Sequence, residues 1–394
     1  MNNITKKRVL YFMPDNPVAS KGGSVTRTTQ LLDYFGQHAD VLEVDFSSKK
    51  YWNEWTEEDI KNFKNRFPKI GLKIIDQRMK PKDLFNYLKY YKIPRLCARI
   101  FPKKKHIDSS CLVFKHRMRK LIKEKKYDIV IISYVSWGNF VNKNLDAYFI
   151  LDSHDFMTVQ YLQKEAIGKK LDIGREFSAE IDILKKFNEI WTYSIEEEYI
   201  FEQFTGKKVN LIPISFKADA INNFAQAKYP VVYVAGNNPH NVVSAKWYVD
   251  QVVPLLGDIK TYVVGSICDK MDDHPNIVKL GIVEDLDAFY KQSKISICPM
   301  LTGTGVKIKV LEALSFGIPV VTSRRGVDGL LNKTQNGCLV SQTEFEFARN
   351  IKNLLEDEAY HREIAAQGYS YFKVNHAEEK ERKFLDAIFL NNND

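Results

Sequence analysis

The sequence predicts an α/β protein with two doubly wound parallel sheets, each in a domain of its own. The chain has 394 residues, which is more than one hydrophobic core usually organises. Short β-branched runs alternate with helix-like segments, and this alternation starts afresh at Tyr229 and Pro230. Such alternation builds parallel sheets. We therefore expect two Rossmann-like domains that face a central cleft.

The expected strands are nearly continuous in apolar character, as strands covered on both faces must be. In the first half they are Arg8–Met13, Val41–Phe46, Asp128–Ser133, Tyr148–Leu151, Glu189–Tyr193 and Val209–Ile212. In the second half they are Val231–Ala235, Ile259–Val264, Ile277–Leu280, Ile295–Cys298, Pro319–Thr322 and Gly337–Val340. Amphipathic segments between them, such as Val243–Leu256 and Leu286–Gln292, are predicted helices.

These patterns predict a first domain over residues 1–216 and a second over residues 217–375. A helical pattern over residues 376–394 is expected to cross back to the first domain. Residues 49–126 break the strand–helix rhythm and are interpreted as an insertion in the first domain, with a helix at Asp83–Tyr91.

The insertion is strongly basic. Between Arg78 and Lys126 there are 17 Lys or Arg against three acids, a net +14, whereas the whole chain carries +9. A local field of this kind attracts nucleic acid, anionic lipid or anionic glycan. The alternative is a solvated, lysine-rich face without a partner.

Cysteine usage and the N-terminus predict a cytoplasmic protein. The five cysteines (Cys97, Cys111, Cys268, Cys298 and Cys338) are scattered and form no C-x-x-C pair, as expected of reduced thiols. The apolar run near the N-terminus is too short for a signal peptide, and no stretch approaches the length of a membrane span.

The segment LTGTGVKIKVLEALSFGIPVVTS, residues 301–323, carries the most specific chemistry. A loop at Thr302–Gly305 leads into a predicted helix at Val306–Phe316, which Gly317 and Pro319 should end. A glycine-rich loop before a helix N-terminus binds anions through free backbone N–H groups. The pattern matches neither a P-loop nor a G-x-G-x-x-G fingerprint.

Lys309 and Glu312 lie three residues apart and so share one face of this helix. Their axial separation of about 4.5 Å approximates the step from a diphosphate to its ribose. This pair would suit a nucleoside diphosphate. Alternatively, it is an ordinary surface ion pair.

The segment resembles the donor-nucleotide motif of group 1 glycosyltransferases, the retaining enzymes of the GT-B fold. The subgroup in question has the motif Gly-Gly-Gly-Thr-Arg-x-Lys-x-x-Glu-Ala. The matching residues here are Gly303, Thr304, Gly305, Val306, Lys307, Ile308, Lys309 and Glu312-Ala313. The first of two glutamates that many members carry is replaced by Thr304, which puts the contact with the donor sugar in doubt.

The resemblance implies a role for each site residue. Glu312 would bind the ribose, and Lys307, Lys309 and the amides of the loop would bind the diphosphate. Further positions expected at the nucleotide are Gly22, Gly23, Gly236, Gly281, Val283, Gly303, Thr304, Gly305 and Val306. His154 would be an active-site histidine near the donor sugar, although its position also suits a loop or capping histidine.

The implied activity is that of a retaining, metal-independent, hexosyltransferase-type enzyme in surface polysaccharide or glycoconjugate synthesis. Its donor would be a UDP- or GDP-linked sugar, with no further cofactor. No metal site is expected, because the histidines form no ligand-spaced cluster and the Asp269, Asp272 and Asp273 group is interpreted as a loop.

The acceptor, a glycan or lipid-linked glycan, is expected at the basic insertion. The insertion would also place the enzyme peripherally at an anionic membrane surface. Its aromatic residues expected at the interface are Trp52, Trp55, Phe63, Tyr87, Tyr90 and Tyr91.

Other functions stay open at this point. A sugar-nucleotide epimerase has a similar two-domain fold, and a degenerate paralogue could serve as a non-catalytic binding partner. A nucleic-acid binder is disfavoured because the basic segment lacks a recognition helix or an aromatic RNA-binding motif.

Overall fold

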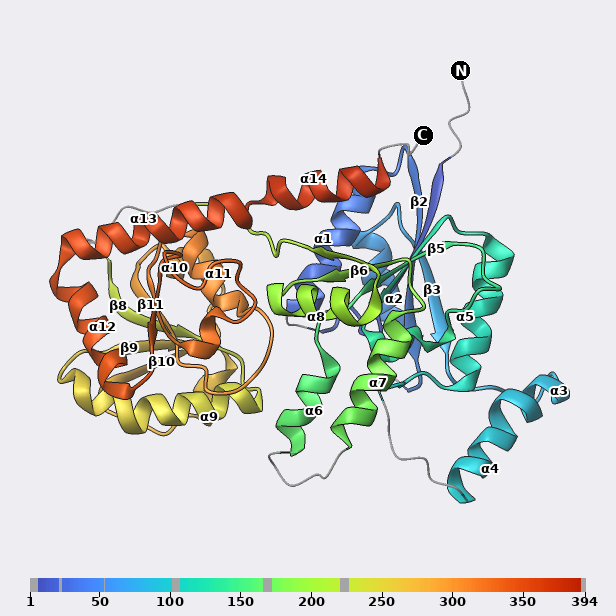
Figure 1. Cartoon of the computed structure of the whole chain (residues 1–394), viewed down its shortest axis with the longest axis horizontal. Helices are drawn as coiled ribbons and strands as arrows, with labels where there is room; N and C mark the ends of the chain where they lie inside the picture. Colours follow the sequence, from blue (N-terminus) through green and yellow to red (C-terminus); the bar gives the residue numbers. More distant parts are fainter. Residues whose placement is uncertain are drawn as a thin grey trace. The chain divides into compact units, whose positions relative to one another are not determined.

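The computed structural model describes residues 6–20, 23–52, 54–100, 107–165, 172–219 and 227–390 (Figure 1). Contacts within the chain divide it into two units. The first comprises Met1–Thr192, Glu197–Leu211 and Leu385–Asp394, and the second comprises Tyr193–Glu196 and Ile212–Phe384. Each unit contains one parallel sheet, so the predicted pair of Rossmann-like domains is confirmed.

The first unit is built on a seven-stranded sheet in the order β3-β2-β1-β4-β5-β6-β7. Its strands are β1 (Lys7–Phe12), β2 (Leu42–Lys50), β3 (Gly71–Asp76), β4 (Ile129–Ser133), β5 (Tyr148–Asp152), β6 (Glu189–Thr192) and β7 (Lys208–Leu211). All five residues of β4 are buried, because helices cover both faces of the sheet. The strand order reverses direction between β1 and β4, the two strands paired at the centre.

Helices connect these strands. They are α1 (Gly23–Gln37), α2 (Glu57–Arg66), α3 (Leu84–Tyr87), α4 (Ile93–Ile100), α5 (Leu112–Lys125), α6 (Met157–Glu165), α7 (Ile173–Leu184) and α8 (Ile195–Thr205). A π-helical stretch, Leu88–Lys92, joins α3 to α4, and a 3-10 helix, Val135–Phe140, follows β4.

The segment 49–126 is only partly an insertion, which corrects the sequence interpretation. Its residues Gly71–Asp76 form β3, the edge strand that pairs in parallel with β2. Trp55 and Phe63 are 1% and 0% exposed and pack around Phe46. These two aromatic residues therefore belong to the core, and the expectation that they meet a membrane is wrong.

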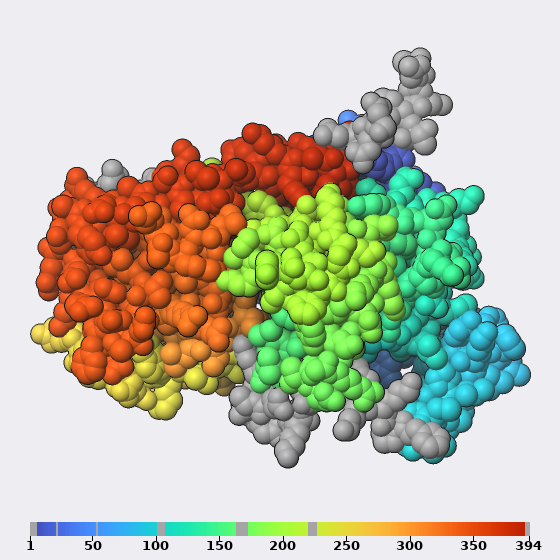
Figure 2. Space-filling model, in the orientation of Figure 1, coloured from blue at the N-terminus to red at the C-terminus, as the bar shows by residue number. Residues whose placement is uncertain are grey.

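The part of this segment that does project is the helical stretch Leu84–Ile100, here called the arm. It contains α3, the π-helical stretch and α4, and it lies at the margin of the first unit, light blue in Figures 1 and 2. None of its described side chains is buried. The predicted helix at Asp83–Tyr91 is confirmed in type and extends further than expected.

The second unit contains a six-stranded parallel sheet in the order β10-β9-β8-β11-β12-β13. Its strands are β8 (Tyr229–Val234), β9 (Thr261–Val264), β10 (Ile277–Gly281), β11 (Ser293–Cys298), β12 (Val320–Ser323) and β13 (Cys338–Ser341). Here the strand order reverses between β8 and β11. In open α/β sheets this switch point, at the carboxyl ends of the strands, is where ligands bind.

The helices of the second unit are α9 (Pro239–Trp247), α10 (Leu286–Tyr290), α11 (Ile308–Ser315), α12 (Glu344–Glu356), α13 (Glu358–Asn375) and α14 (Glu378–Phe389). A π-helical and a 3-10 stretch, Tyr248–Val252 and Val253–Leu256, continue α9, and 3-10 helices lie at Ser266–Lys270 and Arg324–Val327. The last residues of α14, from Leu385, are grouped with the first unit, where Phe389 contacts the ring of Phe35.

Helix α11 is held by one apolar face and ended by a glycine. Leu311 and Leu314 are fully buried in a cluster with Val320. Gly317 follows the helix with φ +69°, the left-handed conformation that glycine adopts without steric cost. The prediction that Gly317 ends this helix is confirmed.

Candidate nucleotide site and a buried histidine

The loop between β11 and α11 presents an uncapped helix N-terminus. Gly303 and Gly305 have φ +99° and +70°, values that other residues rarely adopt. A Cβ added at Gly305 would meet no atom within 4 Å, so open space lies beside the backbone there. Lys307, at the N-cap, makes no side-chain capping hydrogen bond, and the first turn contains no acid. The loop is therefore suited to receive an anion at the helix amides.

Lys309 lies in the first turn of α11, and its side chain points toward β8 and the start of α9. Its ammonium donates a 2.9 Å hydrogen bond to Asn241 Oδ1 and lies 5.1 Å from the centre of the Tyr233 ring. Burial lowers the pKa of Lys309, and the charge of Lys307 lowers it further. An incoming anion would relieve both effects, because it would favour the charged ammonium.

Glu312 lies one turn further along α11. Its carboxylate accepts a hydrogen bond of 3.4 Å from the hydroxyl of Tyr290. Burial raises the pKa of Glu312, while the Tyr290 hydroxyl and the charge of Lys309 oppose this shift. Burial, helped by Glu312, also raises the pKa of Tyr290 well above its ordinary value, so that the phenol stays a hydrogen-bond donor.

Lys307 differs from Lys309 in what its ammonium contacts. Its side chain is buried, and Nζ donates to the carbonyl oxygens of Thr304 and Gly305 at 3.3 and 2.7 Å. These bonds hold the loop in shape. The prediction that Lys307 binds a diphosphate directly stays a prediction.

The loop after β8 and the start of α9 complete this site. Of their residues, the sequence predicted only Gly236 there. Asn238 caps α9 and accepts from the amide of Asn241, while Asn241 Nδ2 donates to the carbonyl of Gly236 at 2.9 Å. His240 contacts Thr302 Oγ1 through Nδ1 at 2.9 Å. The two loops at the β8/β11 switch point are thus joined by direct hydrogen bonds. The sequence signal was the run NNPHN directly after an apolar strand.

The remaining predicted residues of the second unit lie at the end of β10 and just after it. Gly281 ends β10 with φ +70°, and β10 is separated from β11 by two strands. Val283 is partly buried against a cluster that contains Val232 and Phe289. Asn241 links Gly236 to Lys309 by hydrogen bonds. The roles of Gly281 and Val283 at the nucleotide stay predictions.

In the first unit, His154 lies in a strained and buried setting after β5. Its Nε2 lies 3.1 Å from Asp152 Oδ2, and its ring stacks on Tyr134 with centroids 4.5 Å apart. Both His154 (φ +58°) and Tyr134 (φ +65°) adopt left-handed backbone conformations. Such strain costs about 1–3 kcal/mol per residue and clusters at functional sites.

The start of α1 approaches this histidine through Tyr134. Burial raises the pKa of Tyr134, whose side chain is hydrogen-bonded to Ser24, the second residue of α1. Gly23 is the first residue of that helix, next to Ser24. Gly22 lies outside the described residues.

The described part of the chain contains no group of three His, Cys, Asp or Glu residues arranged to hold a metal ion. Among the same residues, no helix is long and apolar enough to cross a membrane.

Residues 229–357 match the family model Glycosyl transferases group 1. This matched segment lies within the second unit and contains both loops of the switch point, together with α11. The resemblance inferred from the motif is therefore supported for the second half of the chain.

Similar proteins extend the comparison to the first unit. The chain is 25% identical over 308 residues to an uncharacterized 44.6 kDa protein in the cps region of Klebsiella pneumoniae, covering 70% of this chain and 77% of the relative. Sucrose-phosphate synthase from Thermosynechococcus elongatus is similar in structure, with a TM-score of 0.69, 15% identity and 98% of each chain covered. HepE of Anabaena, solved in complex with UDP, has a TM-score of 0.65 and 12% identity, covering 97% of this chain and 99% of that chain. These similarities establish the GT-B fold.

Proposed function

We propose that this chain is a retaining glycosyltransferase that moves a sugar from a UDP- or GDP-linked donor to a glycan or lipid-linked glycan in surface polysaccharide or glycoconjugate synthesis. The family match over residues 229–357 supports a transferase. The UDP in the HepE structure supports a nucleotide-sugar donor. The name of the Klebsiella relative, a protein in the cps region, supports the proposed setting.

The observation that carries this proposal is the combination at the β8/β11 switch point. The N-terminus of α11 is uncapped, Lys309 is oriented by Asn241, and Glu312 follows one turn later beside Tyr290. In the proposed complex, the helix amides and Lys309 bind the diphosphate and Glu312 binds the ribose hydroxyls. Each group then has a partner of opposite charge or complementary hydrogen-bonding character.

The proposed chemistry needs chiefly stabilisation of the leaving group. The bond between the anomeric carbon and the diphosphate oxygen breaks, and a bond to the acceptor oxygen forms on the same face of the sugar. The departing diphosphate oxygen takes the acceptor proton. Negative charge grows on the diphosphate during this step, so preorganised amides and Lys309 would supply the largest catalytic effect. We propose that no metal ion takes part, and that His154 is a further catalytic residue.

Binding of nucleotides tests the site. In thermal-shift and calorimetric titrations with UDP, GDP and ADP, we expect one nucleoside diphosphate to stabilise the protein by mass action. Lys309→Ala and Glu312→Ala should each remove most of this shift. The controls are Lys270→Ala and Glu356→Gln, which change exposed side chains in the same unit. Equal shifts in the site variants and the controls would refute the site.

Turnover separates the remaining functions. With a nucleotide-sugar donor and an extract that contains the acceptor, we expect release of nucleoside diphosphate only when the acceptor is present. NMR of the product should show that the anomeric configuration is retained. An altered sugar nucleotide formed without acceptor would indicate an epimerase. Binding without turnover of any donor would indicate a degenerate, non-catalytic paralogue.

The arm supports the proposal that the enzyme works at an anionic membrane surface. Phe85 and Ile100 are 71% and 69% exposed. Between Leu84 and Ile100 the sequence contains four Lys or Arg and no acid. Exposed apolar and basic side chains on one helical segment are typical of helices that lie in a membrane interface.

Vesicle co-sedimentation tests this placement. The protein should bind vesicles that contain phosphatidylglycerol, and binding should weaken in Phe85→Ser/Ile100→Ser and at high salt. Phe345→Ser, a change of an exposed residue in the second unit, is the control. Absence of binding at low salt would contradict the proposal.

A further inference from the structure

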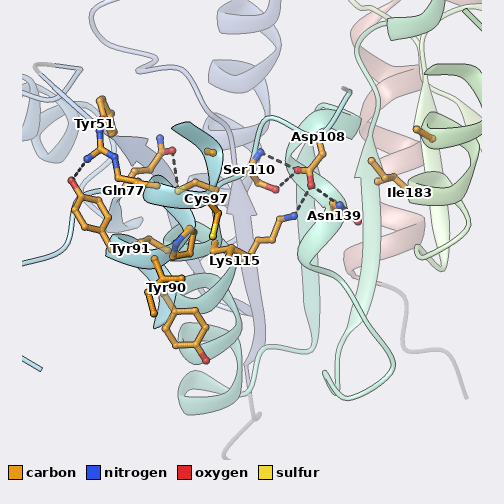
Figure 3. Close-up of a pocket in the computed structure, with 18 of the residues that line it drawn as sticks. Tyr51, Gln77, Tyr90, Tyr91, Cys97, Asp108, Ser110, Lys115, Asn139 and Ile183 are labelled. Carbon is orange, nitrogen blue, oxygen red and sulfur yellow. Dashed lines mark hydrogen bonds and ion pairs between the residues drawn. The ribbon is translucent and has the colours of Figure 1, made fainter. Parts of the chain in front are cut away.

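A large pocket opens within the first unit, between the arm and the body of the domain (Figure 3). Its volume is about 1340 Å³, and α4, the start of α5 and α7 contribute to its walls. Small-molecule sites typically span about 300–1,000 Å³, so this pocket has room for a long ligand. Figure 3 shows Tyr90, Tyr91 and Cys97 of the arm on one side and Asp108 and Asn139 on the other.

Much of the wall is hydrocarbon. Ile93 and Ala98 contribute from α4, Leu112 and Val113 from the start of α5, and Ile183 from α7. Ile93 and Leu112 are 52% and 46% exposed, so the pocket presents apolar surface to a ligand. An apolar chain in the pocket would remove this surface from water, at about 25 cal/mol per Å².

The polar part of the wall has an excess of positive charge. Two acids, Asp108 and Asp182, face four cations, which are Arg95, Lys115, Arg175 and Lys186. Among the described residues, only Lys115 of these cations forms an ion pair, with Asp108. Arg95 donates instead to the neutral hydroxyls of Tyr51 and Tyr91. Lys186 donates to the side-chain oxygen of Asn139, so three of the four cations form no ion pair among the described residues.

The oxygens of Asp108 are engaged by groups of the pocket wall. They accept from Ser110, Lys115 and Asn139, and Asn139 in turn accepts from Lys186. Burial opposes the charge of Asp108, but the hydrogen bonds that it accepts still lower its pKa. Burial lowers the pKa of Lys186 and the charge of Lys115 lowers it further, while Asp108 and Asp182 oppose this shift. An anion close to Lys186 would oppose both effects and stabilise its charge.

We propose that this pocket binds an amphiphile that carries a phosphate, with its hydrocarbon between α4 and α7 and its phosphate at Lys186, beside Asn139. The identification of this amphiphile as the lipid part of the acceptor rests on the proposed function. Binding of an amphiphilic phosphate to the pocket does not depend on that function. The arm then has two roles, since its outer side chains meet the bilayer while Ile93 and Ala98 contact the lipid taken from it.

Dodecyl phosphate below its micellar concentration is a suitable probe in isothermal titration calorimetry. We expect saturable binding of one equivalent, with dodecanol and inorganic phosphate each bound at least tenfold more weakly. Equal affinity for dodecanol would show that the phosphate is not recognised. Equal affinity for inorganic phosphate would show a simple anion site. Either result, or no saturable binding, overturns the proposal.

Variants test each part of the pocket. Lys186→Ala should weaken binding of dodecyl phosphate at least tenfold, whereas Lys143→Ala, at an exposed lysine of the same unit, should not. Ala98→Trp should block the hydrocarbon part of the pocket. Leu96→Trp, on the same helix but outside the pocket lining, is its control. Unchanged affinity in both pocket variants overturns the proposal.

Cys97 provides an independent readout, because it lines the pocket and is exposed. Dodecyl phosphate should slow alkylation of Cys97 by N-ethylmaleimide in proportion to occupancy, and an unchanged rate at saturation would contradict binding there. The nucleotide-induced thermal shift should stay unchanged in Ala98→Trp. Failure of the pocket is thereby distinguished from failure of the proposed function, which would abolish the nucleotide shift in the wild type.

Discussion

The ammonium of Lys309 donates a hydrogen bond to the side-chain oxygen of Asn241 across 2.9 Å. Asn241 also donates to the carbonyl of Gly236, so that one amide group ties the loop after β8 to the helix after β11. These are the adjacent strands at which the sheet order reverses. The bond thus fixes a lysine at the point where the fold favours ligand binding.

Asn241→Ala should weaken binding of the preferred nucleoside diphosphate roughly tenfold, since a hydrogen bond to a charged group contributes about 1.5–3 kcal/mol. The reason is that Lys309 would lose the partner that orients it. Calorimetric titration measures the loss, and Asn353→Ala, at an exposed position of α12, is the control. An unchanged dissociation constant in Asn241→Ala would show that Lys309 needs no such orientation.

Gly305→Ala should reduce nucleotide affinity and stability together. A Cβ at Gly305 meets no neighbour, so the loss of folding stability comes from the left-handed backbone and is about 1–2 kcal/mol. Gly257 is a matched control, with φ +64° and equally open space. Gly257→Ala should lower the melting temperature similarly but leave the nucleotide dissociation constant unchanged. If both variants bind nucleotide like the wild type, the loop is not part of the site.

The affinity for nucleotide should depend on pH through Glu312. Burial raises the pKa of this carboxyl above its ordinary value of 4.5. If the carboxylate form binds the ribose, affinity is full above the raised pKa and falls as the pH drops through it. Titrations between about pH 4.5 and pH 8 should show this fall in the wild type, and Glu312→Gln should be weak and nearly independent of pH across the same range. The same slope in both proteins would assign the titration to another group.

His154→Ala should lower turnover by about 10²–10³, the usual loss when one group that stabilises the transition state is removed. Nucleotide affinity should change little, because the candidate nucleotide site lies in the second unit. Initial rates and calorimetry on the same preparation give both quantities. Loss of affinity with unchanged turnover would indicate that His154 serves in binding alone.

Glu197 should make stability decrease as the pH rises. Burial raises its pKa to about 8, against the hydrogen bond from Thr192. Since the folded state keeps a proton that the unfolded state releases above about pH 4.5, the contribution of Glu197 to stability is full below about pH 4.5 and declines toward pH 8. The slope is at most about 1.4 kcal/mol per pH unit for one group. Urea unfolding at several pH values should show this decline in the wild type, and a smaller one in Glu197→Gln. Identical slopes would exclude Glu197 as the source.

The sequence predicted most strands because covered parallel strands leave a continuous apolar run. It missed β3, because only one of the six residues in this edge strand is buried, so no such run appears. The aromatic residues of the basic segment were misassigned for a related reason. Sequence composition does not distinguish Trp52, which is exposed, from Trp55, which packs against Phe46.

The part of the candidate site that lies in one continuous segment of the chain was predictable from the sequence. Gly303, Gly305 and Lys309 form one loop and helix, and the structure confirms the loop conformation and the helix. The partner of Lys309 was not predictable, because 68 residues separate it from Asn241 and the contact exists only when β8 pairs with β11. The environment of His154 likewise depends on Tyr134, which follows another strand.

A crystal structure of the protein with its preferred nucleoside diphosphate tests the central claim most directly. We expect the β-phosphate at about 3 Å from backbone amides at the start of α11 and from the ammonium of Lys309, with the ribose hydroxyls hydrogen-bonded to Glu312. A nucleotide bound elsewhere, with this helix N-terminus in contact only with protein or water, would contradict that claim.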